Sequence, residues 1–337
     1  MGAPYQDGRM FLIDDRELIP LEADVLAVGR SASRKVFAIA KRSGIELVKG
    51  WDGEVISSLA WPTGREGIPT GYEVEVDPRP PAVTQLVPFD SGDRALLVCS
   101  EGVYVLDEKQ AHRLLPTGED YVEHFGYLQD EAPDEPLSHD MSMEHAALSP
   151  DNRLIACGHQ SDRHRVFDAD TYECVAEIGH MSEYPHYAQF SRSGDMLALN
   201  SCHFYNGITL GVATSLVRGL DTASYEQDKR FIELEGGARV YAAVSRGDEF
   251  IVGDASGYLR AFDTKGNFRW QMFIGSSVGD IDLDATGKRL VVSTYAGFVS
   301  MVDLDTGERP IFQIGTADHA ERRRFLIWKN ERKPIIW

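Results

Sequence analysis

The stretch MEHAALSPDNRLIACGHQSDRHRVFDADTYECVAEIG, from Met143 to Gly179, carries the clearest structural signal in the chain. It reads as two apolar strands separated by a Ser-Pro-Asp turn, then a polar turn and two further strands. Four short strands joined by hairpin turns form one antiparallel sheet. The unit returns as RVYAAVSRGDEFIVGDASGYLRAFDTKGNFRWQMFIG from Arg239 and as GDIDLDATGKRLVVSTYAGFVSMVDLDTGERPIFQIG from Gly279. Such a repeat indicates the blades of a β-propeller.

Weaker copies complete the ring. They begin at Asp24, Val83 and His186, and the last has an insertion near 215–228. The chain ends contain further strand-like segments, of which 324–337 supplies two and 9–21 supplies two. Pairing of these terminal strands would bury the apolar C-terminus and add one more blade. We therefore predict an all-β fold: one domain over 1–337, a seven-bladed β-propeller of four-stranded antiparallel blades, closed by its N- and C-terminal strands.

The apolar pattern argues against an α/β fold. Runs such as RLIACG and RLVVST are nearly continuous in apolar residues, as expected for strands covered on both faces. No apolar period of 3.6 residues continues for more than about three turns, so long helices between strands are not predicted.

The repeats resemble those of the WD40 family. The resemblance lies in Leu148-Ser149-Pro150-Asp151 before the second strand, Asp162 in the following turn, Phe167-Asp168 where the family has Trp-Asp, and Gly179-His180 at the entry to the next blade. Other copies keep only the apolar-Asp pair. The resemblance implies a binding platform whose function lies in loops carried by a rigid ring.

The net charge and the N-terminal sequence limit the kinds of partner and location that we expect for the protein. The chain has 53 acidic against 34 basic residues, a formal net charge of −19, which disfavours nucleic acid and anionic lipid and favours a basic partner. The N-terminal residues have no basic leader or long apolar run, so we expect a cytoplasmic protein with no membrane contact. The cysteines at 99, 157, 174 and 202 lack metal-ligand spacing and are expected to be reduced thiols.

The long segment 116–142 is the strongest candidate binding site. It has many acids and several aromatic residues but no Lys or Arg, and connections of this length are usually functional or disordered. Aromatic anchors among acids suit a basic protein partner, and a merely solvated insertion is the alternative. The predicted partner-binding residues are Glu119, Asp120, Tyr121, Glu123, Phe125, Tyr127, Asp130, Glu131, Asp134 and Glu135, with Glu183 and Tyr184 from a nearby turn.

Catalytic and metal signals are weak. Four histidines fall in or next to predicted turns and would approach a metal ion only if those turns share one face: His159, His180, His186 and His203. No HxH or HExxH spacing supports a metal site, so we expect structural histidines, no metal and no cofactor. The GxSxG match from Gly275 to Gly279 joins two predicted strands instead of a strand and a helix, which argues against a nucleophile.

Two function classes follow. The first is a monomeric, non-catalytic interaction propeller that binds a basic protein, including the specific case of a bacterial immunity protein or antitoxin that neutralises a cationic toxin. The second is a cytosolic propeller enzyme, similar to lactonases or hydrolases, with its site at the central channel.

Overall fold

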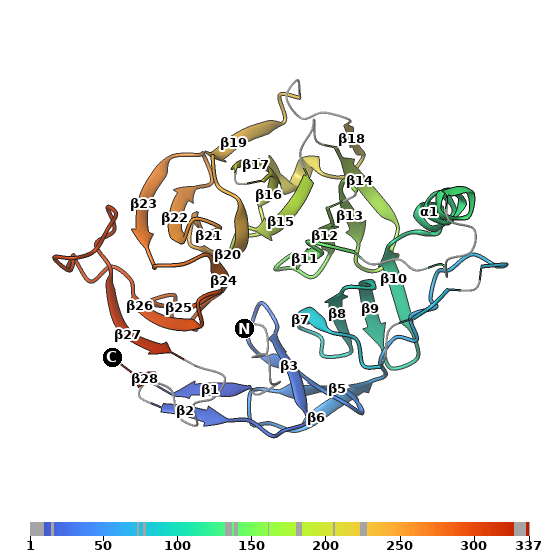
Figure 1. Ribbon diagram of the computed structural model, residues 1–337, viewed down its shortest axis with the longest axis horizontal. Coiled ribbons are helices and arrows are strands. Elements are labelled where there is room, and N and C mark those ends of the chain that lie inside the picture. The colour runs from blue at the N-terminus through green and yellow to red at the C-terminus, as the bar shows by residue number, and fades with distance from the viewer. Residues whose placement is uncertain are drawn as a thin grey trace.

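The computed structural model describes residues 10–14, 17–72, 74–76, 79–131, 137, 141–160, 162–179, 184–204, 206–222, 228–326 and 335–336. Six sheets of four or five strands, mostly antiparallel, are arranged around a central channel as the blades of a β-propeller (Figure 1). The predicted all-β fold is thus confirmed in its class, and the described residues include one α-helix. No helix in the described part of the chain is long and apolar enough to cross a membrane.

The first three blades follow one another along the chain. Blade one contains β3 Val25–Arg30, β4 Val36–Lys41, β5 Gly44–Lys49 and β6 Val55–Leu59. Blade two contains β7 Val83–Pro88, β8 Arg94–Cys99, β9 Gly102–Asp107 and β10 Ala111–Leu115, and helix α1 (Gly118–Glu131) leads from it to blade three. Blade three contains β11 His145–Leu148, β12 Leu154–Gly158, β13 His164–Asp168 and β14 Cys174–Ile178.

The other three blades complete the ring. Blade four contains β15 Tyr184–Phe190, β16 Met196–His203, β17 Asn206–Ala213 and β19 Phe231–Gly236. Blade five contains β20 Val240–Arg246, β21 Glu249–Asp254, β22 Tyr258–Asp263 and β23 Phe268–Phe273. Blade six contains β24 Val278–Leu283, β25 Arg289–Thr294, β26 Phe298–Asp303, β27 Ala320–Leu326 and β28 Ile335–Ile336.

The segment predicted as an insertion near 215–228 sits between the third and fourth strands of blade four. It follows the short 3₁₀ turn η1 (Thr214–Leu216) and contains β18 (Leu220–Thr222), which pairs in parallel with β14. Blade three therefore gains a fifth strand from the chain of its neighbour.

Strand direction defines two ends of the ring. The first strand of each blade lines the channel, and we call the end where these strands begin the upper end and the end where they finish the lower end. Because successive strands alternate in direction, the turns between second and third strands lie at the upper end, together with the connections from blade to blade. The turns between first and second strands lie at the lower end.

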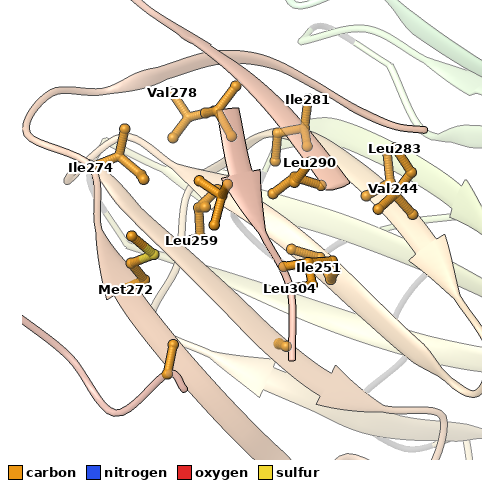
Figure 2. Packing of buried hydrophobic residues seen from close by; sticks show 14 of the residues in the cluster. Val244, Ile251, Leu259, Met272, Ile274, Val278, Ile281, Leu283, Leu290 and Leu304 are labelled. Carbon is orange, nitrogen blue, oxygen red and sulfur yellow. The ribbon is translucent and has the colours of Figure 1, made fainter. Parts of the chain in front are cut away.

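The apolar core is divided into clusters between neighbouring blades. Five clusters of buried residues join blades one and two, two and three, three and four, four and five, and five and six. Figure 2 shows the last of these, where Ile251 and Leu259 of blade five face Ile281 and Leu290 of blade six. At Gly29 the backbone of β3 comes so close to β7 that an added Cβ would lie 1.9 Å from the carbonyl oxygen of Leu86.

Polar contacts link the last blade to the first. The Nε of Arg30 on β3 donates to both carboxylate oxygens of Asp282 on β24, at 3.1 and 2.9 Å, and its Nη2 also contacts that carboxylate. The guanidinium of Arg34 donates to the carbonyl oxygen of Leu283. We call the Arg30–Asp282 pair the ring clasp.

The predicted seventh blade is not confirmed. The segment expected to begin it lies in β27, which pairs with β26 as the fourth strand of blade six, with Phe325 opposite Val299. Strand β28 pairs with β27, and β1 (Phe11–Asp14) pairs with β2 (Glu17–Pro20) as a separate hairpin. The sequence pattern did not assign β27 to blade six because the long connection from Leu304 to His319 separates β27 from β26 in the sequence.

Candidate functional site

The acidic segment 116–142 contains a folded helix. The hydroxyl of Thr117 accepts a hydrogen bond from the Asp120 amide at 3.2 Å, and the Asp120 carboxylate accepts one from the Thr117 amide at 2.7 Å. This reciprocal capping begins α1. On its inner face Tyr121 and Phe125 are buried in a small apolar cluster with Val74. These two rings are therefore part of the core under the helix and are not surface anchors.

The remaining residues of the helix divide between structure and surface. Asp120 forms a two-pronged ion pair with Arg165 of blade three, at 2.7 and 2.9 Å, which attaches the helix to the ring. Tyr127 is 63% exposed. Four acids lie exposed on the outside of the helix: Glu119, Glu123, Asp130 and Glu131. Of the other predicted residues, Tyr184 is exposed at the start of β15, whereas Asp134, Glu135 and Glu183 lie outside the described residues.

Three of the four histidines considered for metal binding, His159, His186 and His203, lie in the described ranges and form no metal site there. Burial lowers the pKa of His159 to about 4, and its Nε2 lies 3.9 Å from the Asp162 carboxylate. His203 stacks on Tyr184 with ring centroids 5.7 Å apart. His180 lies outside the described residues. Within the described ranges, no three His, Cys, Asp or Glu side chains are placed to hold a metal ion.

A buried histidine pair in blade three was missed by the sequence analysis. The Nδ1 of His145 donates to the carbonyl oxygen of Met143 at 2.8 Å, and the Nε2 atoms of His145 and His164 are 3.0 Å apart. This geometry makes His145 Nε2 the acceptor and His164 Nε2 the donor. The pair joins the first and third strands of the blade, and only the three-dimensional arrangement of the strands brings the two residues together.

The channel has a volume of about 1200 Å³ and is lined by the first strands of the blades. Arg239 organises its upper mouth on the side of blades four and five. The Nε of Arg239 donates to Nε2 of His186 at 3.1 Å, and its Nη1 donates to the carbonyl oxygen of Phe204 at 2.7 Å. Its guanidinium lies 5.2 Å from the centroid of the Tyr241 ring. Tyr241 in turn contacts Tyr295, with ring centroids 5.6 Å apart.

His186 is held neutral at this mouth. Its Nδ1 donates to the carbonyl oxygen of Val240 at 2.5 Å, while its Nε2 accepts from Arg239. Burial, with a smaller contribution from the adjacent Arg239 charge, lowers the pKa of His186 to about 4. Both ring nitrogens are thus engaged in positioning the surrounding residues.

Two residues at this mouth have unusual backbone conformations. Met143 and Phe204 have φ values of 58° and 55°, in the left-handed region that favours glycine. Both contact Arg239, Phe204 through its carbonyl oxygen and Met143 through its sulfur, 3.9 Å from Nη2. A non-glycine residue there costs of order 1–2 kcal/mol, so both turns are held in place by their surroundings.

Exposed aromatic side chains gather at the upper end. Phe204, in the turn between β16 and β17, and Tyr295, in the turn between β25 and β26, are each 72% exposed. With Tyr184, Arg239 and Tyr241 they form what we call the rim cluster. Among the described residues, Phe268 is an exposed aromatic residue at the opposite end, because it begins the fourth strand of blade five.

A protruding turn adds apolar residues at the same end. Ile311 and Phe312 are 89% and 92% exposed. A hydrogen bond from the Gln313 amide to the carbonyl oxygen of Pro310, 2.9 Å long, closes their turn. The segment after the turn is attached to β23 by a hydrogen bond from the Phe273 amide to the carbonyl oxygen of Ile314, also 2.9 Å long. Phe273 ends β23 at the upper end, which places the turn beside that end. The protruding hairpin is visible next to β23 and β27 in Figure 1.

No protein-family model and no curated protein matches this chain. A similar solved structure is the crystal structure of the computationally designed Ika8 protein. It shares 13% sequence identity, covers 82% of this chain and 70% of its own, and has a TM-score of 0.48. A likeness at this level carries no functional argument, so the site is interpreted from its own residues.

Proposed function

We propose that this protein is a non-catalytic interaction propeller that binds a basic protein partner through its upper end. The observation that carries the proposal is the concentration of exposed aromatic residues there, in the rim cluster and on the turn of Phe312. Tyr, Phe, Met and Arg are enriched in the buried centres of protein interfaces. The rim cluster consists of Tyr, Phe and Arg residues, and the hydrogen bonds of Arg239 to His186 and to the Phe204 carbonyl oxygen hold it without a partner.

The charge distribution supports a basic partner. Helix α1 joins the upper ends of blades two and three, so its exposed acids lie at the same end as the rim cluster. Acids around an aromatic centre speed the encounter with a positively charged protein, while the buried rings supply most of the affinity. The formal net charge of −19 acts in the same direction.

Three finer statements belong to this proposal. The blades are degenerate WD40-type repeats, supported by Phe167-Asp168 at the end of β13 and Asp162 in the preceding turn. The protein acts as a cytoplasmic monomer. Its partner is a cationic toxin, which makes the protein an immunity protein or antitoxin, supported by the strong acidity and the preformed aromatic surface.

The second candidate is an enzyme with its site in the central channel, and the size of the channel favours it. Against it, two histidines that line the channel already have hydrogen-bond partners: His145 pairs with His164, and His186 pairs with Arg239. A stoichiometric metal in the purified protein, together with turnover of an ester or lactone that is lost on sealing the channel, would establish this function instead.

The test of the main proposal is affinity capture from source-cell extract with the tagged full chain, followed by titration of the purified captured protein. We expect Phe204→Asn and Tyr295→Ser each to weaken binding by more than about tenfold, as central interface residues do. Asn tolerates the left-handed backbone at position 204, so folding is preserved. Binding should also weaken as salt rises, because acids contribute to the encounter.

Phe268→Ser is the matched control, because it removes an exposed aromatic ring from the opposite end of the ring. It should leave the affinity unchanged. A partner that binds the two rim variants as tightly as the wild type, or that is lost equally with Phe268→Ser, would exclude the upper end as the binding surface.

A further inference from the structure

The lower mouth of the channel carries a group of basic side chains that the proposed function does not use. Arg34 of blade one, Arg192 of blade four, Arg246 of blade five and Lys288 of blade six all line the channel. Each residue lies in the turn between the first and second strands of its blade, or is the strand residue next to that turn. These cations share the mouth with four carboxylates, Asp90, Asp282, Asp284 and Asp305.

Arg34 is the fourth residue of its lower turn, a position with a positive φ at which other blades have glycine or asparagine. In five blades the lower turn closes with a hydrogen bond from the amide of its fourth residue to the carbonyl oxygen of its first. That fourth residue has a φ between 59° and 78°, and it is Gly92, Asn152, Gly194, Gly287 or Arg34. Gly and Asn tolerate this conformation, whereas an arginine is strained. Strained residues are concentrated at functional sites.

Arg34 and Arg192 line the same channel from the lower turns of blades one and four. Burial and the positive charges of Arg30 and Arg192 lower the pKa of Arg34. The turn of Arg192 is fixed, since its amide donates to the Ser245 hydroxyl at 2.7 Å. In the described part of the chain the Arg192 side chain has no hydrogen-bond or ion-pair partner, and the same holds for the Lys288 ammonium.

The carboxylates at this mouth are already engaged. Asp282 is held by Arg30, and Asp305 by Arg246. Asp90 accepts hydrogen bonds from the amide and hydroxyl of Ser33, at 3.1 and 2.6 Å. Asp284 accepts from the amides of Lys288 and Arg289, at 2.8 and 3.0 Å, and from the Thr286 hydroxyl. Among the described residues, donors without a partner therefore remain on the Arg192 and Lys288 side chains and on Nε and Nη1 of Arg34, whose Nη2 contacts Leu283 and Asp282.

We propose that the lower mouth of the channel is a binding site for an anionic group, a phosphate or a carboxylate, held between Arg34 and Arg192 with Lys288 beside them. Guanidinium groups bind both kinds of anion through paired, charge-assisted hydrogen bonds. An anion there would relieve the repulsion between the two arginines. This site lies at the end opposite the rim cluster and is independent of the proposed protein partner.

The test is isothermal titration calorimetry of the full chain at low ionic strength with two probes, inorganic phosphate and succinate. We expect saturable one-site binding of at least one probe. Arg192→Ala should weaken that binding about tenfold or more, because it removes charge-assisted hydrogen bonds. Its melting curve should stay that of the wild type, since the side chain holds no partner. Binding of phosphate alone identifies a phosphoryl ligand, and binding of succinate alone identifies a carboxylate ligand.

Two further variants complete the design. Arg34→Gly removes the second guanidinium while placing glycine where the backbone favours it, and it should also weaken binding. Arg153→Ala is the matched control, because Arg153 is an exposed arginine at the lower end of blade three that does not line the channel. Absence of saturable binding for both probes, or an equal loss in the Arg153 variant, would overturn the proposal.

Discussion

Replacing Asp282 by alanine removes the carboxylate of the ring clasp and leaves Arg30 without its main partner. Among the described residues, the five apolar clusters join the other neighbouring blades, whereas the contacts that link blades six and one include Arg30–Asp282 and the Arg34 contact to Leu283. We therefore expect this junction to be the place where the ring opens first. The loss should be larger than for an ordinary surface ion pair.

The magnitude follows from burial and geometry. The side chains of Arg30 and Asp282 are 24% and 28% exposed, between the surface and the interior. Exposed pairs contribute about 0.2–1 kcal/mol, and breaking a fully buried pair costs about 3–5 kcal/mol. With Arg34 also 3.6 Å from the same carboxylate, we expect Asp282→Ala to lower the free energy of unfolding by about 2 kcal/mol.

The pH dependence has a definite sign. Burial opposes ionisation of Asp282, but the hydrogen bonds and charge of Arg30 outweigh it and hold the pKa of this carboxyl below its ordinary value. A carboxyl whose pKa is depressed in the folded state contributes fully at neutral pH, and its contribution is lost as the pH falls below about 4. The difference between wild type and Asp282→Ala should therefore shrink in acid.

The assay is a double-mutant cycle of Arg30→Ala and Asp282→Ala, measured by urea unfolding at pH 7. We expect a coupling energy of about 1.5–2 kcal/mol. The control cycle uses Lys41 and Glu46, an ion pair within blade one, for which we expect about 0.5 kcal/mol. Hydrogen exchange should also quicken in β3 and β24 of the Asp282 variant. A coupling energy no larger than the control, with unchanged exchange in those strands, would refute the account of ring closure.

Three further predictions concern buried groups. Phe125→Ala should lower the free energy of unfolding by about 3–5 kcal/mol in urea unfolding, because its ring is fully buried under α1; a loss below 1 kcal/mol would contradict this. Burial raises the pKa of Asp162 to about 6, so the stability of Asp162→Asn relative to wild type should rise by up to about 3 kcal/mol as the pH rises from 4 to 6.5. A pH-independent difference would be inconsistent with that shift. The NMR signals of His186 should show no midpoint between pH 8 and 5, because burial lowers its pKa to about 4; a midpoint near 6.5 would mean that the imidazole is not buried.

The repeat pattern predicted the blades well because burial of the inner strands between neighbouring blades requires the same apolar runs that form the pattern. The run RLIACG became β12, whose residues from Leu154 to Gly158 are all buried between neighbouring blades. The weaker copies from Asp24, Val83 and His186 also became blades. The number of blades was harder to predict, because the blade to which a terminal strand belongs depends on which strand it pairs with. The long connection between β26 and β27 hides that pairing in the sequence.

The candidate site was harder to predict, for physical reasons. The spacing of Tyr121 and Phe125, four residues apart after a Thr-x-x-Asp cap, is a helical signal that indicates burial of both rings. That helical spacing distinguishes the buried rings of Tyr121 and Phe125 from the exposed acidic residues of the helix. Phe204 and Tyr295 are distant in sequence and are linked through Arg239 and Tyr241 only when the ring is assembled. Nothing local to each of them indicates that shared location.

Hydrogen exchange of the full chain with and without its captured, purified partner tests the central claim most directly. We predict that the partner slows exchange at the upper end, in the turn of Phe204, the turn of Tyr295 and the segment around Phe312. The lower turns from Ser31 to Arg34 and from Ser191 to Gly194 should exchange as in the free protein. Protection confined to those lower turns, with unchanged exchange at the rim cluster, would contradict the proposed interaction surface.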